Sequence, residues 1–150
     1  MLDIINVSKS FNKGTPIQKN ALIGLNLHLD KGDFVTVIGG NGAGKSTMLN
    51  AVAGVFNIDK GKIKIDGVDV TKTPEYKRAK YIGRVFQDPL KGTAGDMWIE
   101  ENLAFALRRG KTRSFKWGIS NKEREMFKDL LAPLDLGLEQ RLSAKVKLLS

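Results

Sequence analysis

The sequence of 150 residues has no cysteine and only one histidine, His28. Without cysteine the chain can form neither disulfides nor thiolate metal sites, and a lone histidine cannot build a histidine metal cluster. Any metal must therefore be held by oxygen atoms. His28 shares the polar side of a period-two pattern with Asn26 and Asp30, which predicts an exposed strand histidine with no catalytic role.

Long apolar runs are also absent from the sequence. No uninterrupted stretch approaches the ~18 residues that a membrane span needs, and the N-terminus lacks the charged lead and apolar core of a signal peptide. We therefore expect an intracellular chain that does not itself cross a bilayer. The 41% of hydrophobic and 27% of charged residues fit one globular domain with a modest core.

Acidic residues are too few to balance the basic ones, and the formal net charge is +9. Residues 1–75 carry 9 basic and 7 acidic groups, an excess of +2, whereas residues 76–150 carry 16 and 9, an excess of +7. Such a basic half suits nucleic acid, an anionic membrane surface or an acidic partner. It also suits a solvated surface that only favours solubility.

Strand patterns fill much of the first half. Residues 2–7 form a short apolar strand pattern, and residues 25–30 alternate apolar and polar side chains as a half-buried strand does. The compact, β-branched run from Phe34 to Ile38 is typical of a strand buried on both faces of a parallel sheet.

Two further strand signals follow. Asp66-Gly67 separates two short alternating stretches within residues 62–70, which predicts a tight hairpin. Residues 81–86 predict a second core strand, and Gln87-Asp88-Pro89 ends it because proline donates no backbone hydrogen bond.

Helical patterns begin at Lys45 and dominate the second half. The first predicted helix places Met48, Leu49 and Val52 on one side and ends at Gly54. The later helices carry a stripe of Ile99, Leu103, Ala106 and Leu107, a capping box over Ser120-Asn121-Lys122-Glu123, and a second stripe of Met126, Phe127, Leu130 and Leu131. The pattern predicts a sheet-rich lobe followed by a helical lobe.

The stretch GGNGAGKST, residues 39–47, lies between the predicted strand 34–38 and the first helix. It satisfies the pattern G-x-x-x-x-G-K-[ST], whose glycines let backbone amides converge on an anion. The helix that begins at its end adds a partial positive charge of roughly half a unit. The strand, loop and helix order is the context that this motif requires, so we predict a phosphate-binding loop.

The last three residues of this loop carry the predicted chemistry. The Lys45 ammonium is expected to reach the β- and γ-phosphates of a nucleotide, and the Ser46 hydroxyl to bind Mg²⁺. Thr47 is expected to support the α-phosphate. A guanine-reading N-K-x-D motif is absent, because Glu123-Arg124 follows the only candidate in the second half, Asn121-Lys122. ATP is therefore favoured over GTP.

The whole chain resembles the ATP-binding subunit of ATP-binding cassette (ABC) transporters. LDIINVSKSF resembles the first strand and aromatic loop of that family, IDKGKIKIDGVDV resembles its hairpin, and YIGRVFQDP resembles the segment that ends in its glutamine loop. The resemblance implies an α/β fold with a P-loop NTPase core, an ABC-type antiparallel β subdomain and part of the helical subdomain. The lobes are expected over residues 1–87 and 88–150.

The resemblance also implies the site residues. Phe11 matches the ring that stacks on adenine, with a core aromatic as the alternative interpretation, and Gln87 matches the contact to Mg²⁺ or the attacking water. Lys45 and Gln87 are the implied catalytic residues. The implied nucleotide-binding residues are Phe11, Gly39, Gly40, Asn41, Gly42, Ala43, Gly44, Lys45, Ser46 and Thr47.

The final Leu149-Ser150 matches the start of the family's LSGGQ signature. The sequence contains neither the rest of that signature nor the Mg²⁺-supporting aspartate, the general-base glutamate and the switch histidine of the family. We therefore expect a fragment of a larger ATPase that binds ATP but is deficient in hydrolysis.

The resemblance implies an ATPase subunit at the inner face of the cell membrane, which couples Mg-ATP to solute transport. Its implied partners are transmembrane permease subunits, a second ATP-binding subunit and a substrate-binding protein, with no nucleic acid. The alternative is a soluble ABC-type ATPase that acts on nucleic acid or ribosomes, because the basic segment 108–117 interleaves Phe115 and Trp117 with five cations. A solvated loop is a further interpretation of that segment.

Overall fold

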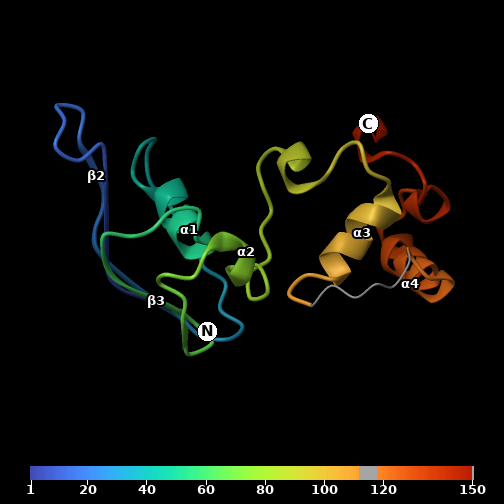
Figure 1. Cartoon of the computed structure of the whole chain (residues 1–150), viewed down its shortest axis with the longest axis horizontal. Helices are drawn as coiled ribbons and strands as arrows, with labels where there is room; N and C mark the ends of the chain where they lie inside the picture. The colour runs from blue at the N-terminus through green and yellow to red at the C-terminus, as the bar shows by residue number, and fades with distance from the viewer. Residues whose placement is uncertain (112–117, 150) are drawn as a thin grey trace. The chain divides into compact units, whose positions relative to one another are not determined.

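A computed structural model describes residues 1–111 and 118–149 (Figure 1). The chain divides into two compact units, Met1–Ile82 and Gly83–Ser150. The first unit contains every strand of the described chain, and the second contains most of its helical residues.

The first unit is built on an antiparallel sheet whose strands lie in the order β2-β1-β3-β4. In β1, Leu2 pairs with Leu29 of β2 on one side and with Ile65 of β3 on the other. The strands predicted from residues 2–7 and 25–30 are therefore confirmed, and both extend further than their patterns indicated. The four strands are β1 (Leu2–Phe11), β2 (Lys19–Leu29), β3 (Lys60–Ile65) and β4 (Val68–Asp69).

The turn between β3 and β4 is the predicted Asp66-Gly67 hairpin. Both residues have positive φ angles, 49° at Asp66 and 77° at Gly67. Positive φ at both central positions is what a type I′ turn requires, and its twist matches that of the flanking strands. Pairing of Ile65 with Val68 closes the hairpin.

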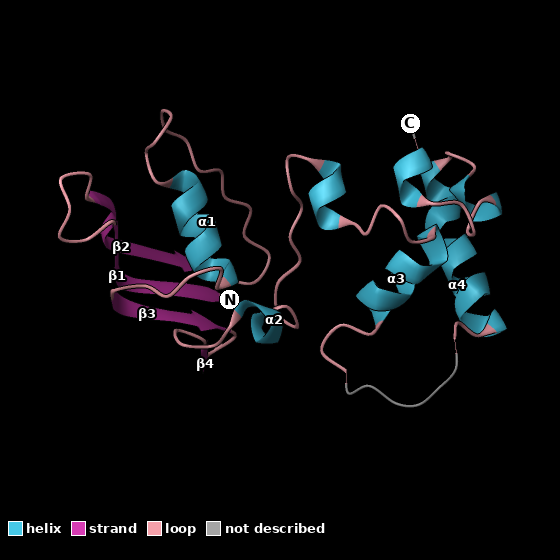
Figure 2. Cartoon of the chain, turned by 45° about the horizontal axis from the view of Figure 1, so that its top comes forward, coloured by secondary structure: helices cyan, strands magenta, loops and turns pink. Residues whose placement is uncertain are grey.

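Helix α1 (Lys45–Ala53) packs against one face of this sheet (Figure 2). Gly54 ends the helix in the left-handed conformation, with its amide donating to the carbonyls of Asn50 and Ala51, as a helix-ending glycine does. Leu49 was predicted on the buried side but is 57% exposed. The buried residues of this unit's core are Ile4, Val7, Leu22, Met48, Ala51, Ile63, Ile65 and Val70.

The two core strands predicted over residues 34–38 and 81–86 do not form. Phe34 is 92% exposed, Ile38 91% and Val85 97%, and no strand pairing among the described residues includes them. A strand needs neighbours for its amides and carbonyls, and the antiparallel sheet is completed by other segments. The apolar patterns of these two segments suit buried strands, but no strand in the described part of the chain pairs with either segment.

A short helix, α2 (Glu75–Arg78), follows the hairpin and was not predicted. The second unit then contains two longer helices that pack on each other, α3 (Ile99–Leu107) and α4 (Asn121–Leu131). Its 3₁₀ turns are η1 (Pro89–Gly92), η2 (Ala132–Leu134), η3 (Leu138–Gln140) and η4 (Val146–Leu148). None of the helices in the described ranges is long and apolar enough to span a bilayer.

The core of the second unit differs from the predicted stripes at two positions. Ala106 and Leu130 are exposed, whereas Ala104 is buried in place of Ala106. The buried residues are Ile99, Ala104, Phe127, Leu131 and Leu142.

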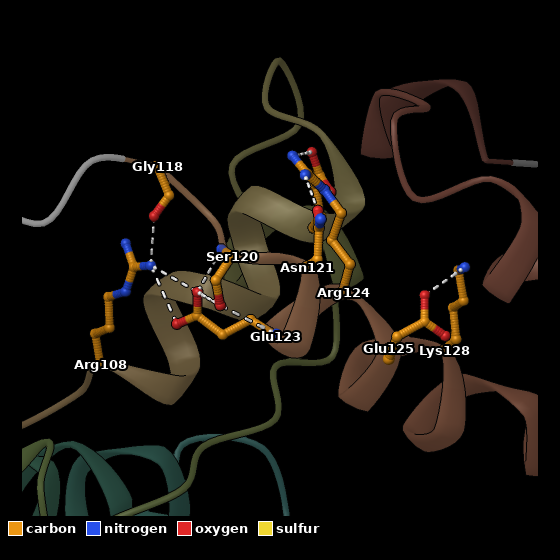
Figure 3. A network of polar contacts seen from close by, with 9 residues as sticks. Arg108, Gly118, Ser120, Asn121, Glu123, Arg124, Glu125 and Lys128 are labelled. Carbon is orange, nitrogen blue, oxygen red and sulfur yellow. Dashed lines mark hydrogen bonds and ion pairs between the residues drawn. The ribbon is translucent and has the colours of Figure 1, made fainter.

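The predicted capping box at the start of α4 is confirmed (Figure 3). The Ser120 hydroxyl accepts from the Glu123 amide at 3.3 Å, and the Glu123 carboxylate accepts from the Ser120 amide at 2.8 Å. The Arg108 guanidinium also donates to Glu123, at 3.2 Å, and to the Gly118 carbonyl, at 2.8 Å. This contact ties the end of α3 to the start of α4. The hydrogen bonds from Ser120 and then the one from Arg108 lower the pKa of Glu123.

Candidate phosphate-binding site

The predicted phosphate loop leads directly into α1. Gly42 and Gly44 have φ angles of 79° and 89°, which side chains other than glycine rarely adopt. A Cβ atom on Gly44 would lie 2.6 Å from the carbonyl oxygen of Ala21 in β2. The backbone of the loop therefore rests on the backbone of β2, and only glycine allows this approach.

The first amides of α1 are available to an anion. The first hydrogen bond within the helix runs from the Met48 amide to the Gly44 carbonyl, at 2.8 Å. The amides of Lys45, Ser46 and Thr47 precede that bond, and N-terminal amides of a helix have no partner within it. No side chain caps this terminus. A negatively charged group would satisfy these amides and interact favourably with the helix dipole.

The Lys45 side chain folds back along the loop that precedes it. Its Nζ atom donates to the carbonyl oxygens of Gly39, at 2.6 Å, and Gly40, at 2.8 Å. An ammonium has three donors, so two are used within the loop and the third can serve a ligand. The two contacts hold the positive charge at the mouth of the loop, where an anion on the amides would meet it.

The Ser46 hydroxyl is an oxygen ligand of the kind that fits a magnesium ion bound together with phosphate. Ser46 is exposed in the first turn of α1, so its hydroxyl is accessible from solvent. Mg²⁺ prefers oxygen and is usually bound by few protein groups in addition to phosphate oxygens and water. Among the described residues, no group of three or more His, Cys, Asp or Glu side chains forms a separate metal cluster.

Phe11 lies half-buried at the end of β1. Its ring meets Phe56 edge-on, with 5.3 Å between centroids and 84° between planes. The Lys9 ammonium lies over both rings, 5.3 Å from the Phe11 centroid and 5.1 Å from that of Phe56. Phe11 thus has a partly structural environment, and its exposed part remains available to a planar ligand.

Charged groups fix the end of β1 next to this ring. Asp59 accepts a hydrogen bond from the Ser10 amide at 2.7 Å, and its carboxylate lies 2.9 Å from the Lys13 ammonium. The Lys13 contact, followed by the Ser10 amide, lowers the pKa of Asp59. The carboxylate therefore stays ionised and holds the position of the strand that carries Phe11.

The structure reveals a positioning residue that the sequence patterns missed. Arg78 of α2 is only 1% exposed, and its guanidinium donates to the carbonyls of Ala51 and Val52 at the end of α1, at 2.8 and 2.9 Å. It also donates to the carbonyls of Thr73, at 2.7 Å, and Thr71, at 3.1 Å. Burial lowers the pKa of this guanidinium. Arg78 fastens the C-terminal end of the helix whose N-terminus forms the site.

Gln87 is exposed and lies at the start of the second unit, whereas the loop and Phe11 belong to the first. The role of Gln87 therefore stays a prediction from the resemblance. Most of the basic segment 108–117 lies outside the described residues.

A protein-family model described as "ABC transporter" matches residues 22–150. The Tyrosine transport ATP-binding protein of Clostridioides difficile is 39% identical over 150 residues, which are all of this chain and 59% of that protein. The Spermidine/putrescine import ATP-binding protein PotA of Haemophilus influenzae is 37% identical over 111 residues, 74% of this chain and 27% of that protein. The Bacitracin export ATP-binding protein BceA of Halalkalibacterium halodurans is 33% identical over 112 residues, 71% of this chain and 43% of that protein.

Solved structures of ATP-binding cassettes are also similar to this chain. The dimeric ATP-binding cassette MJ0796, in a post-hydrolysis state bound to ADP and Pi, has a TM-score of 0.75 at 27% identity. The ADP conformation of the cassette MJ1267 has a TM-score of 0.72 at 28% identity. Both comparisons cover 100% of this chain, and it covers 63% and 59% of the two solved chains. The chain thus spans about three-fifths of the relatives that match its whole length.

Proposed function

This chain belongs to the ABC transporter family, and from that premise we propose that it binds Mg-ATP as part of the ATPase subunit of a membrane transporter. The observation that supports this most is the glycine loop at the start of α1. There, left-handed glycines precede helix amides that have no partner within α1, and the Lys45 ammonium lies against the carbonyls of Gly39 and Gly40. This arrangement suits a chain of phosphates, and a turn that binds no ligand does not require it.

Each residue of the loop has a distinct proposed role. The amides of Gly42 and of residues 44–47 bind phosphate oxygens, whereas the Ala43 amide donates to the Gly40 carbonyl within the loop, at 3.3 Å. The third Lys45 donor binds the terminal phosphates. The Ser46 hydroxyl holds Mg²⁺, which when bound neutralises charge on the phosphates. Thr47 supports the α-phosphate. The close packing of Gly44 against β2 limits the movement of the end of the loop that joins α1.

The remaining proposed contacts come from outside the loop. The exposed part of Phe11 stacks on adenine, which would contribute ~1 to 3 kcal/mol without reading the edge of the base. Gln87 contacts Mg²⁺ or the attacking water, and it links the two lobes proposed over residues 1–87 and 88–150. Both assignments rest on the resemblance of the segments that contain them, since a relative in this family matches the whole chain.

The proposed subunit acts at the inner face of the cell membrane with permease subunits, a second ATP-binding subunit and, in an importer, a substrate-binding protein. The curated relatives are named for tyrosine, spermidine/putrescine and bacitracin transport. Their cargoes differ widely, so the shared part supplies energy and is not the part that recognises the cargo. These names favour transport over the soluble ATPase of the alternative interpretation.

We propose further that this chain alone binds ATP but turns it over poorly. Phosphoryl transfer depends on a positioned water and on charges that neutralise the transition state. The 150 residues carry the phosphate loop and the predicted glutamine loop, but not the family's general-base glutamate. We therefore expect ATP binding without appreciable hydrolysis by these 150 residues.

Titration calorimetry with Mg-ATP tests the proposed binding. The chain is expected to bind ATP, and Lys45→Ala is expected to weaken binding at least tenfold, because a charge-assisted contact to phosphate is lost. Lys31→Ala is the matched control, since it removes an exposed lysine from the turn after β2. Folded protein that gives no heat with Mg-ATP would contradict the proposal.

Two further measurements test the proposed lack of turnover and the nucleic-acid alternative. Phosphate release by the chain alone is expected to stay near background even with ATP bound. Titration with single-stranded DNA and RNA at physiological salt is expected to show no specific binding, and a strong, salt-dependent signal would favour the nucleic-acid alternative.

A further inference from the structure

Lys19 is the first residue of β2, and it lies directly opposite Phe11, the last residue of β1. Residues that face each other in an antiparallel pair project their side chains to the same face of the sheet. The lysine and the proposed adenine-stacking ring therefore share one face at one end of the β1–β2 pair.

The ammonium of Lys19 reaches the middle of the glycine loop. A Cβ atom built on Gly42 would lie 3.3 Å from the Nζ atom of Lys19. The two residues are 23 positions apart in the sequence, so the fold brings this second cation to the loop. Gly42, with no side chain and a φ angle of 79°, leaves the space that the ammonium occupies.

The backbone holds this arrangement in place. Two residues after Lys19, the carbonyl of Ala21 lies under Gly44, so close that a Cβ atom there would stand 2.6 Å from it. A Cβ atom on Gly44 would also touch the Leu22 side chain, at 3.4 Å. Lys19 thus begins a strand on which the loop rests, and its distance from the loop is limited by backbone packing.

The charge of Lys19 has no acidic partner in the part of the chain that the structure describes. No carboxylate there forms an ion pair with its ammonium, and the side chain is exposed. By contrast, Lys9 and Lys13 both form ion pairs with Asp59. Two ammoniums, those of Lys19 and Lys45, therefore lie on one glycine loop. An anion on the loop would relieve the repulsion between them.

We infer that Lys19 is a second cationic contact for the polyphosphate of the bound nucleotide, in addition to Lys45. This inference rests on the proposed function of the loop. A nucleotide that extends from the Phe11 ring to the loop passes the Lys19 ammonium, which favours nucleoside di- and triphosphates over nucleosides. The alternative is an exposed lysine that lies near the loop but does not contact the nucleotide.

The test compares Lys19→Gln and Lys19→Arg with the wild-type chain in titrations with ADP, Mg-ATP and adenosine. Lys19→Gln is expected to weaken binding of ADP and ATP about fivefold, as loss of an exposed charge pair does, and to leave adenosine binding unchanged. Lys19→Arg is expected to retain most of the affinity. Raising the salt concentration should narrow the difference between wild type and Lys19→Gln, because salt screens an exposed contact.

Lys31→Gln is the matched control, because it removes the same charge near the opposite end of β2. Equal nucleotide affinity of Lys19→Gln and wild type would overturn the inference. An equal loss for adenosine and ATP would also overturn it, since Lys19 would then act on the fold or on the base. Failure of this inference is distinguishable from failure of the proposed function: in the latter case wild type itself does not bind, or Lys45→Ala binds as well as wild type.

Discussion

Replacing Arg78 with methionine should loosen α1 more than any exposed substitution nearby. The variant keeps an unbranched apolar side chain of similar length but removes the four hydrogen bonds to the carbonyls of Thr71, Thr73, Ala51 and Val52. The Ala51 carbonyl is the most enclosed of the four acceptors, and water reaches the other three more easily.

The magnitude follows from these four contacts. We assign about 2 kcal/mol to the buried contact with Ala51 and about 1 kcal/mol to each of the other three, which totals about 5 kcal/mol. Removing a buried charge returns part of this, about 1 to 2 kcal/mol, because the guanidinium no longer has to be desolvated. Arg78→Met is therefore expected to lower the free energy of local unfolding of α1 by about 3 to 4 kcal/mol.

Hydrogen exchange followed by mass spectrometry measures this loss in individual peptides. Peptides of the first unit can therefore be followed separately from those of the second. Peptides that cover residues 48–54 should exchange about 100- to 1000-fold faster in Arg78→Met, if exchange reports the opening equilibrium. Lys77→Met is the control, since Lys77 is exposed on the same short helix. Identical exchange in the two variants would refute the reasoning, because it would mean that the four contacts contribute nothing to holding α1.

Three further predictions address other parts of the chain. The hydrogen bond between His28 and Asp3, at 2.6 Å, raises the pKa of His28, so nuclear magnetic resonance should find it above 6.5 and Asp3→Asn should lower it. The raised pKa means that protonated His28 adds stability at pH values below its unfolded pKa. That stability disappears as pH rises through the folded pKa, and a pH series of thermal unfolding that shows the reverse trend would contradict the assignment. Gly44→Ala should lose ATP binding and lower the melting temperature, because its Cβ atom would lie 2.6 Å from the Ala21 oxygen; an unchanged calorimetric titration would refute this. Ser120→Ala should destabilise α4 by about 1 kcal/mol in urea unfolding followed by tryptophan fluorescence, whereas Ser120→Asp should retain the cap.

Local signals predicted local structure well. The Asp66-Gly67 turn and the Ser120–Glu123 capping box both form, because a few neighbouring residues determine their geometry. The helix that ends at Gly54 forms for the same reason. The strand predicted over residues 34–38 fails, since an apolar run shows that a segment suits burial but not that a partner is present to bury it.

The site was predictable only in part. The glycine spacing before Lys45 identifies the loop, because the chemistry of phosphate binding depends on consecutive residues. Arg78 and Lys19 gave no such signal. Their positions depend on contacts with residues more than 20 places away in the sequence, and a basic residue in a polar segment usually faces solvent. Burial and side-chain hydrogen bonds revealed Arg78. Strand pairing and the approach to Gly42 revealed Lys19.

The exposed apolar run from Phe34 to Ile38 should make this chain associate with itself reversibly as the temperature rises. Attraction between apolar surfaces strengthens as water is warmed from refrigerator to room temperature. Solutions of this chain should therefore scatter more light on gentle warming, well below the temperature at which its helices melt, and clear again on cooling. A lysine in place of Ile38, which is 91% exposed, should suppress that reversible clouding.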